Sequence, residues 1–176
     1  MLIRRLTPSD LNTFQALRLA ALQEAPSAFA SSYEEEVAFP PSVNEDRLSE
    51  KPDQAVFGAF IDGVLVGVVA LGRESMLKLR HKAFLWGMYV APRYRGHGVA
   101  RTLLVEALSF ARTTKEVRQV NLGVNASNTS AVRLYESLGF KAFGREEGAM
   151  WVDGELHDEL LMSLLVRRST PTAELT

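Results

Sequence analysis

A buried strand, a glycine turn and an amphipathic helix follow one another between residues 86 and 111. Residues 86–90 are mostly apolar and bulky, as a buried strand requires, and Pro92 ends the strand because proline cannot donate to its ladder. Apolar residues then recur every three or four positions and predict a helix with one buried face: Val99, Leu103, Leu104, Ala107, Leu108 and Ala111. Gly96 and Gly98 remove two side chains where this helix begins. Its free N–H groups and positive dipole end can therefore contact an anion, above all a phosphate.

The residues of this turn exclude two common phosphate-binding motifs. A nucleotide P-loop ends in Gly-Lys-Ser or Gly-Lys-Thr, and the chain contains no such tripeptide. A Rossmann turn needs a third glycine where Arg101 stands, and an acidic residue near the end of the next strand, which here ends in Asn125. What remains is Arg-x-x-Gly-x-Gly over residues 93–98, which resembles the acetyl-coenzyme A turn of the GNAT family of N-acetyltransferases.

A second segment, residues 128–140, is similar to the other signature of the same family, Asn-x-x-Ala-x-x-Leu-Tyr-x-x-x-Gly-Phe. Its pattern predicts a helix capped by Ser127 or Asn128, with an apolar face of Ala131, Leu134, Tyr135 and Leu138. Gly139 stands where a left-handed residue ends a helix, and Phe140 can fold back onto the last turn. Taken alone, Tyr135 reads as a packing residue of that turn. The two motifs together, in this order, favour a cofactor site.

Composition predicts one domain over residues 1–168, followed by a flexible tail at 169–176. A hydrophobic content of 47% with 23% charged residues is typical of globular proteins. The net charge of −1 argues against nucleic acid as a partner, and no apolar run approaches the roughly 20 residues that cross a membrane. The N-terminus lacks a signal-peptide core, which points to the cytoplasm. The chain has no cysteine and its three histidines are scattered, so we expect no disulfide, cysteine nucleophile or metal site.

The order of predicted elements indicates an α/β fold, with a mixed, mostly antiparallel sheet and helices on both faces. This order is β-α-α-β-β-β-α-β-α-β-β. Asp62-Gly63 and Asp153-Gly154 each predict a two-residue hairpin turn. Residues 27–41 are expected to form a loop or a short helical turn, and they contain three consecutive glutamates. The same order is what the GNAT resemblance implies, and the resemblance spans nearly the whole domain.

The resemblance implies that acetyl-coenzyme A is the co-substrate. The backbone of residues 88–90 would hydrogen-bond its pantetheine arm, and main-chain N–H groups of residues 95–100 would hold its pyrophosphate. The candidate cofactor-binding residues are Met88, Tyr89, Val90, Arg95, Gly96, His97, Gly98, Val99, Ala100, Arg101, Asn128 and Tyr135. In the family's fold the fourth and fifth strands splay apart, commonly at a bulge, and the thioester lies in that opening.

The chemistry implied by the resemblance is direct acetyl transfer to the primary amine of a small molecule, a peptide N-terminus or a protein lysine. Tyr135 would act as general acid on the leaving thiolate, and the main-chain N–H near Met88 would stabilise the charge on the acetyl oxygen. The absence of cysteine is consistent with transfer that needs no acyl-enzyme. The acceptor amine is the partner we expect, with the protein a monomer or a homodimer.

The general base cannot be assigned from the family pattern. Many members carry a glutamate in the fourth strand, but residues 83–90 contain no carboxylate. The alternatives are a water chain to solvent, a carboxylate from the acidic segment, with Glu35 and Glu36 as substrate-binding residues, or Glu159, unless strand alternation turns it outward. The acidic segment also reads as a solvated turn. The missing base keeps open a second function, a catalytically weak regulatory module that binds acyl-coenzyme A.

Overall fold

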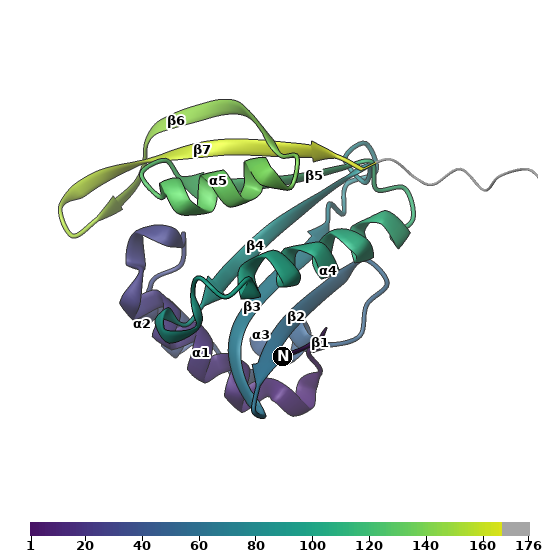
Figure 1. The fold of residues 1–176 in the computed structure, drawn as a ribbon, viewed down its shortest axis with the longest axis vertical. Coiled ribbons are helices and arrows are strands. Elements are labelled where there is room, and N and C mark those ends of the chain that lie inside the picture. The colour runs from purple at the N-terminus through teal and green to yellow at the C-terminus, as the bar shows by residue number, and fades with distance from the viewer. Residues whose placement is uncertain (167–176) are drawn as a thin grey trace, which may run out of the picture.

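The computed structural model describes residues 1–166, whose seven strands form one sheet with helices on both faces (Figure 1). The strands are β1 (Leu2–Arg5), β2 (Gln54–Ile61), β3 (Val64–Arg73), β4 (Lys82–Val90), β5 (Gln119–Asn125), β6 (Lys141–Val152) and β7 (Glu155–Leu165). The α-helices are α1 (Leu11–Glu24), α2 (Tyr33–Ala38), α3 (Pro41–Leu48), α4 (Val99–Thr113) and α5 (Thr129–Ser137). Three short 3-10 turns are η1 (Pro8–Asp10), η2 (Pro26–Ala28) and η3 (Pro92–Tyr94).

The strand order across the sheet is β1-β2-β3-β4-β5-β7-β6, and β4–β5 is its one parallel pair within residues 1–166. That pair is short, because the register runs only from Lys82, opposite Gln119, to Phe84, opposite Asn121. Beyond these residues the two strands diverge, as Figure 1 shows. The sheet therefore opens between β4 and β5. Its mixed, mostly antiparallel pairing, with helices on both faces, confirms the fold class that the sequence predicts.

A bulge in β4 lies beside this opening. Trp86 faces Ala70 of β3, whereas Tyr89 faces Val68, so two residues of β4 stand opposite a single residue of β3. Gly87, inside the bulge, has a φ of 63°, a left-handed conformation that favours glycine. The bulge lies in the part of β4 that no longer pairs with β5.

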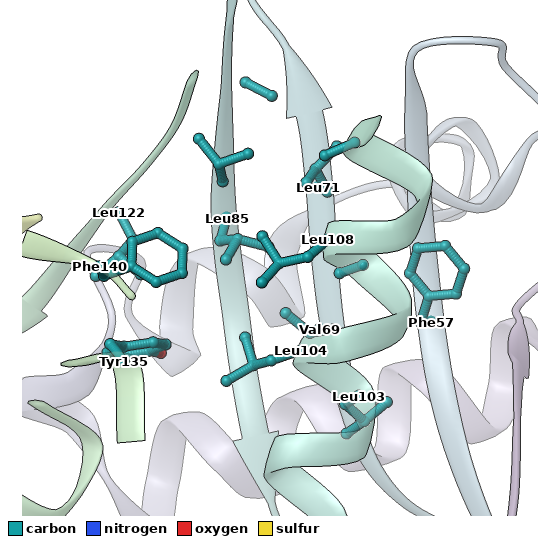
Figure 2. Close-up of a cluster of buried hydrophobic side chains, with 14 of the residues drawn as sticks. Phe57, Val69, Leu71, Leu85, Leu103, Leu104, Leu108, Leu122, Tyr135 and Phe140 are labelled. Atoms are coloured by element: carbon teal, nitrogen blue, oxygen red, sulfur yellow. The ribbon is translucent and has the colours of Figure 1, made fainter. Parts of the chain in front are cut away.

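The core has one cluster on each face of the sheet. The predicted apolar face of α4 is entirely buried and packs against the middle strands, with Leu85 and Val69 among its neighbours (Figure 2). The other cluster lies under α1 and centres on Phe14, Leu22 and Leu6. Both hairpin turns form where the sequence predicts them, at residues 62–63 and 153–154, each with two positive φ angles.

The structure differs from the sequence expectation in the acidic segment, where the short-helix alternative holds. Tyr33–Ala38 forms α2, which adds one helix to the expected order. Ser32 and Glu35 form a capping box, since the Glu35 N–H donates to Ser32 Oγ at 3.2 Å and the Ser32 N–H donates to Glu35 Oε2 at 2.9 Å. The end of the predicted domain at residue 168 and the predicted tail at 169–176 fall outside the described residues. No helix within residues 1–166 is long and apolar enough to cross a membrane.

Candidate active site

A cleft of about 500 Å³ lies where β4, the start of α4, α5 and η2 meet. Every cofactor-binding residue predicted from the sequence lines it except His97, whose Nδ1 lies 2.8 Å from the carbonyl oxygen of Arg95. The lining residues that the sequence did not predict are Ala25, Ala28, Phe29, Tyr94, Ser130, Ala131 and Leu134. The two motifs, separated by β5 in the chain, thus face each other across one cleft.

The glycine turn leaves the N-terminus of α4 open. Gly96 and Gly98 have φ angles of 77° and 78°, and Gly98 is the residue that precedes the helix. No atom of residues 1–166 lies within 4 Å of the point where a Cβ would stand at either glycine. The first N–H groups of α4 are therefore accessible to a ligand, and the positive end of the helix dipole favours an anionic one.

The side chain of Arg95 fastens this turn to α1 and to the strand before it. Its Nε donates to the carbonyl oxygen of Val90 at 2.8 Å, and its Nη2 lies 2.6 Å from Oε2 of Glu24. The guanidinium also lies over the Tyr89 ring, 5.5 Å from the centroid. Arg95 thus holds the turn in place through its side chain.

The helix α5 forms the opposite wall and is capped by Asn128. The Asn128 Oδ1 accepts from the N–H of Ala131 at 3.2 Å, so Asn128, and not Ser127, is the cap. At the other end Gly139 has a φ of 96°, and the N–H of Phe140 donates to the carbonyl oxygen of Tyr135 at 3.1 Å. Phe140 meets Tyr135 edge to face at 5.8 Å between ring centroids, as the sequence predicts (Figure 2).

Tyr135 is buried but reaches both hollows of the site. Only 7% of the residue is exposed, and burial raises the pKa of its phenol to about 12. Besides the main cleft it lines a smaller cavity of about 110 Å³ in the opening between β4 and β5. Met88 lines both hollows as well, opposite Tyr135. The phenol is protonated at neutral pH, so it can donate a proton or a hydrogen bond into this opening.

The turn η2 closes the far side of the opening. Phe29 lines the main cleft and the smaller cavity, and it is buried although it lies within residues 27–41, which the sequence predicts as a loop or a short helical turn. Asn125, at the end of β5, donates from Nδ2 to the carbonyl oxygen of Ser27 at 3.1 Å and so ties η2 to the sheet. A signal that could have found Phe29 is the apolar run Ala28-Phe29-Ala30 between Ser27 and Ser31.

Glu36 is held by two arginines under α1. Its Oε1 accepts from Arg18 Nη2 at 2.9 Å, and its Oε2 accepts from Arg47 Nη1 at 2.8 Å. The residue is 1% exposed, and although burial acts to raise its pKa, the two guanidiniums outweigh burial and lower it. This arrangement favours a structural role for Glu36 over the predicted contact with substrate. Glu35 is exposed and caps α2, as described above.

A third hollow, of about 800 Å³, lies between the η2–α2 segment and the β6–β7 hairpin. Tyr33, Glu34 and Phe29 line one side, and Trp151 and Asp153 line the other. Phe29 belongs to this hollow and to the main cleft, so the two are neighbours. Among residues 1–166 no group of three or more His, Asp or Glu side chains could hold a metal ion.

Known proteins resemble the chain in sequence and in fold. The model of the acetyltransferase (GNAT) family matches residues 18–140. The N-alpha-acetyltransferase RimI of Mycobacterium tuberculosis is 32% identical over 75% of this chain and 80% of its own length. A spermidine N(1)-acetyltransferase of Vibrio cholerae is 31% identical over 57% of each chain, so this chain spans little more than half of that relative. The solved yncA of Salmonella typhimurium, with its cofactor acetyl-CoA, shares the fold at a TM-score of 0.80 and 22% identity, covering 98% of both chains.

Proposed function

Because this chain belongs to the acetyltransferase (GNAT) family, we propose that it transfers an acetyl group from acetyl-coenzyme A to a primary amine. The acceptor would be a small molecule, a peptide N-terminus or a protein lysine. One observation carries the proposal: the open N-terminus of α4 and the buried Tyr135 face a single cleft that continues into the gap between β4 and β5.

The residues of the cleft fit the parts of acetyl-coenzyme A. The N–H groups at the start of α4 and the glycine turn suit the pyrophosphate, because they are accessible and lie at the positive end of the dipole. Beyond Phe84 the edge of β4 has no register with β5, so the main chain of Met88 and the N–H of Val90 are available to the amide-bearing arm, while the Val90 carbonyl oxygen accepts from Arg95. Asn128 faces this edge from α5. The solved yncA, which has the same fold, contains acetyl-CoA as its cofactor, and this supports acetyl-coenzyme A as the ligand.

Acetyl transfer supplies the chemistry, and two groups of this chain would assist it. The main-chain N–H of Met88 would donate to the acetyl oxygen, where negative charge develops during attack. The Tyr135 hydroxyl would give its proton to the departing sulfur. Both residues line the smaller cavity, so the two groups can act on neighbouring atoms of one thioester. Fixing both reactants there removes much of the entropic barrier, and no acyl-enzyme is needed.

The acceptor amine would enter from the third hollow, on the other side of the gap. That hollow borders η2 and carries the aromatic rings of Tyr33 and Trp151 together with the carboxylates of Glu34 and Asp153. The relatives support an amine acceptor but differ in its nature, since one is named for spermidine and the other for an α-amine. A panel of amines, with release of free thiol as the readout, would identify it.

Acetyl-coenzyme A is expected to raise the melting temperature of the protein by about 5–10 °C at a hundredfold excess over its dissociation constant. Such an excess stabilises the folded state by about 2.7 kcal/mol, and a domain of this size gains roughly 2–4 °C per kcal/mol. ATP and NAD should raise the melting temperature only slightly, because the turn departs from the P-loop and Rossmann patterns. Equal stabilisation by ATP would show that the turn is a general phosphate site. If acetyl-coenzyme A stabilises the protein but no amine of the panel causes it to release free thiol, the result would favour the regulatory module instead.

A glutamate at Ala100 should raise the dissociation constant of acetyl-coenzyme A at least about tenfold, or 1.4 kcal/mol. Ala100 lies in the first turn of α4 and lines the cleft, so the new charge would oppose the pyrophosphate. The charge is placed here rather than at Gly98, whose φ of 78° would strain any side chain. Thr102→Glu, on α4 but outside the cleft lining, is the matched control. Isothermal titration of both variants decides, and unchanged affinity in folded A100E would overturn the assignment of the turn.

A further inference from the structure

We propose that Glu159 is the general base that takes the proton from the incoming ammonium. The assignment rests on the acetyl transfer proposed above and fills the role that the fourth strand leaves empty. A lysine-like amine, with a pKa of about 10.4, is mostly protonated at pH 7, so it must lose a proton before it can attack. The base must therefore lie on the acceptor's side of the opening between β4 and β5.

Glu159 has this position because its carboxylate lies over Gly123. Glu159 pairs with Asn125 in the β5–β7 register, and its side chain leans along β5 to the next residue on that face. A Cβ at Gly123 would stand 2.4 Å from the carboxyl carbon of Glu159, so the absence of a side chain at Gly123 makes room for the carboxylate. Gly123 itself lines the cavity in the opening, together with Met88 and Tyr135.

Strand alternation gives the face on which the carboxylate lies. Val120, Leu122 and Val124 of β5 are buried in the core against α4 and α5. Gly123 alternates with these residues along β5, so a Cβ at Gly123 would point to the opposite face of the sheet. The carboxylate of Glu159, which occupies that Cβ position, therefore lies on the opposite face as well. Gly87, across the opening, directs its own Cβ position toward Arg18 of α1 and so also points to that face. The third hollow borders the site there, and Tyr135 approaches from α5 on the first face.

The surroundings of Glu159 suit a proton acceptor. Burial and the carboxylate of Glu146, opposite it on β6, raise its pKa above the usual value. On the same face β5 offers the neutral Asn121 and Asn125, and β7 itself offers His157. Across the opening Arg18 is paired with Glu36. A carboxyl group with a raised pKa is a stronger base than an ordinary one.

The protons balance with Glu159 in this role. The ammonium gives one proton to the Glu159 carboxylate, which passes it to solvent, and the neutral amine then attacks. The new C–N bond forms as the C–S bond breaks, and the sulfur receives a proton from Tyr135. The nitrogen's second surplus proton restores the Tyr135 phenol. The sum is one ammonium and one thioester giving one amide, one thiol and one proton.

The test is the dependence of Glu159→Gln on the basicity of the acceptor. With a lysine-like ε-amine at pH 7, kcat/KM should fall about a hundredfold, the lower end for loss of a general base. With an acceptor whose pKa is about 7.7–8.0, such as a peptide α-amine, the fall should be no more than about tenfold, because roughly a tenth of that amine is already neutral at pH 7. The acidic limb of the pH–rate profile should also move, so that in E159Q it follows the pKa of the acceptor amine. Affinity for acetyl-coenzyme A should stay unchanged, and the melting temperature should not fall, because removing a carboxylate whose pKa is raised in the folded protein does not destabilise it.

Two further variants separate the base from a structural role. Gly123→Ala keeps the charge but forces the carboxylate to move, so it should cost at least about tenfold in kcat/KM and add nothing further to E159Q. Glu155→Gln, an exposed residue on the same strand, is the matched control and should retain full activity.

Equal losses of E159Q with weakly and strongly basic amines, or no loss at all, would overturn the proposal while leaving acetyl transfer in place. If the wild-type protein releases no thiol from acetyl-coenzyme A with any amine of the panel, the proposed function fails, and Glu159 as its base fails with it. The wild-type assay therefore distinguishes the two failures before any variant is measured.

Discussion

Replacing Glu36 with glutamine is expected to lower the melting temperature by about 6–12 °C. The substitution removes the one carboxylate between Arg18 and Arg47 and leaves a nearly buried guanidinium without its counter-charge. Breaking a buried ion pair by removing one partner costs about 3–5 kcal/mol, and the low end applies here because Arg47 is partly solvated. A domain of this size loses roughly 2–4 °C per kcal/mol.

The stabilisation of the fold by Glu36 should be lost as the pH falls. Burial acts to raise its pKa, but hydrogen bonds from Arg47 and Arg18 outweigh burial and hold the folded-state pKa below the usual value. Its stabilisation is therefore fully present above the unfolded pKa of about 4.5, and it is lost as the pH falls through the folded pKa. The difference in melting temperature between wild type and E36Q should be constant near neutrality and should shrink below about pH 4.5.

Glu35→Gln is the matched control, since Glu35 is adjacent, exposed and engaged only in the cap of α2. It should lower the melting temperature by no more than a few degrees, because a cap contributes about 1 kcal/mol. Thermal melts of both variants, with activity measured well below the melting point, decide the role of Glu36. A folded E36Q with unchanged melting temperature but strongly reduced turnover would contradict the structural role and restore Glu36 as a catalytic candidate.

The fold and the cofactor cleft were predictable because their signals are local. The apolar period of α4, the turn glycines and the paired motif at residues 128–140 each fix a conformation within a few residues. The hairpin turns at residues 62–63 and 153–154 follow from the same kind of signal. These local signals predict the order of the elements along the chain, and the two motifs do meet across the opening.

The acceptor side was less predictable because its contacts join distant segments. The pairing of Arg18 with Glu36 crosses 18 residues, and the contact of Asn125 with Ser27 crosses 98. Nothing near Glu36 in the chain shows that two arginines neutralise it. The position of Glu159 depends on a register with β5 and on the missing side chain of Gly123, neither of which a single strand pattern reveals.

Tyr135→Phe should reduce kcat about a hundredfold or more, roughly 2.7 kcal/mol of transition-state stabilisation, while leaving stability and coenzyme affinity nearly unchanged. The ring of Tyr135 packs against Phe140, and phenylalanine keeps that contact. Only the hydroxyl that we propose as proton donor is lost. Single-turnover rates, melting temperatures and binding isotherms measured on the same preparation would separate chemistry from packing.

The raised pKa of Tyr135 sharpens this expectation. A phenol with a pKa of about 12 is a weaker acid than an ordinary phenol. An ordinary thiol has a pKa of about 8.5, so proton transfer from the phenol to the thiolate would be unfavourable in water. The sulfur leaves into the same buried opening, where desolvation disfavours the thiolate and narrows the gap between the two pKa values. The hydroxyl should therefore matter most for donors with poorly acidic thiols. The loss in Y135F should shrink as the leaving thiol becomes more acidic, and a Y135F variant of full activity would assign protonation of the thiolate to water.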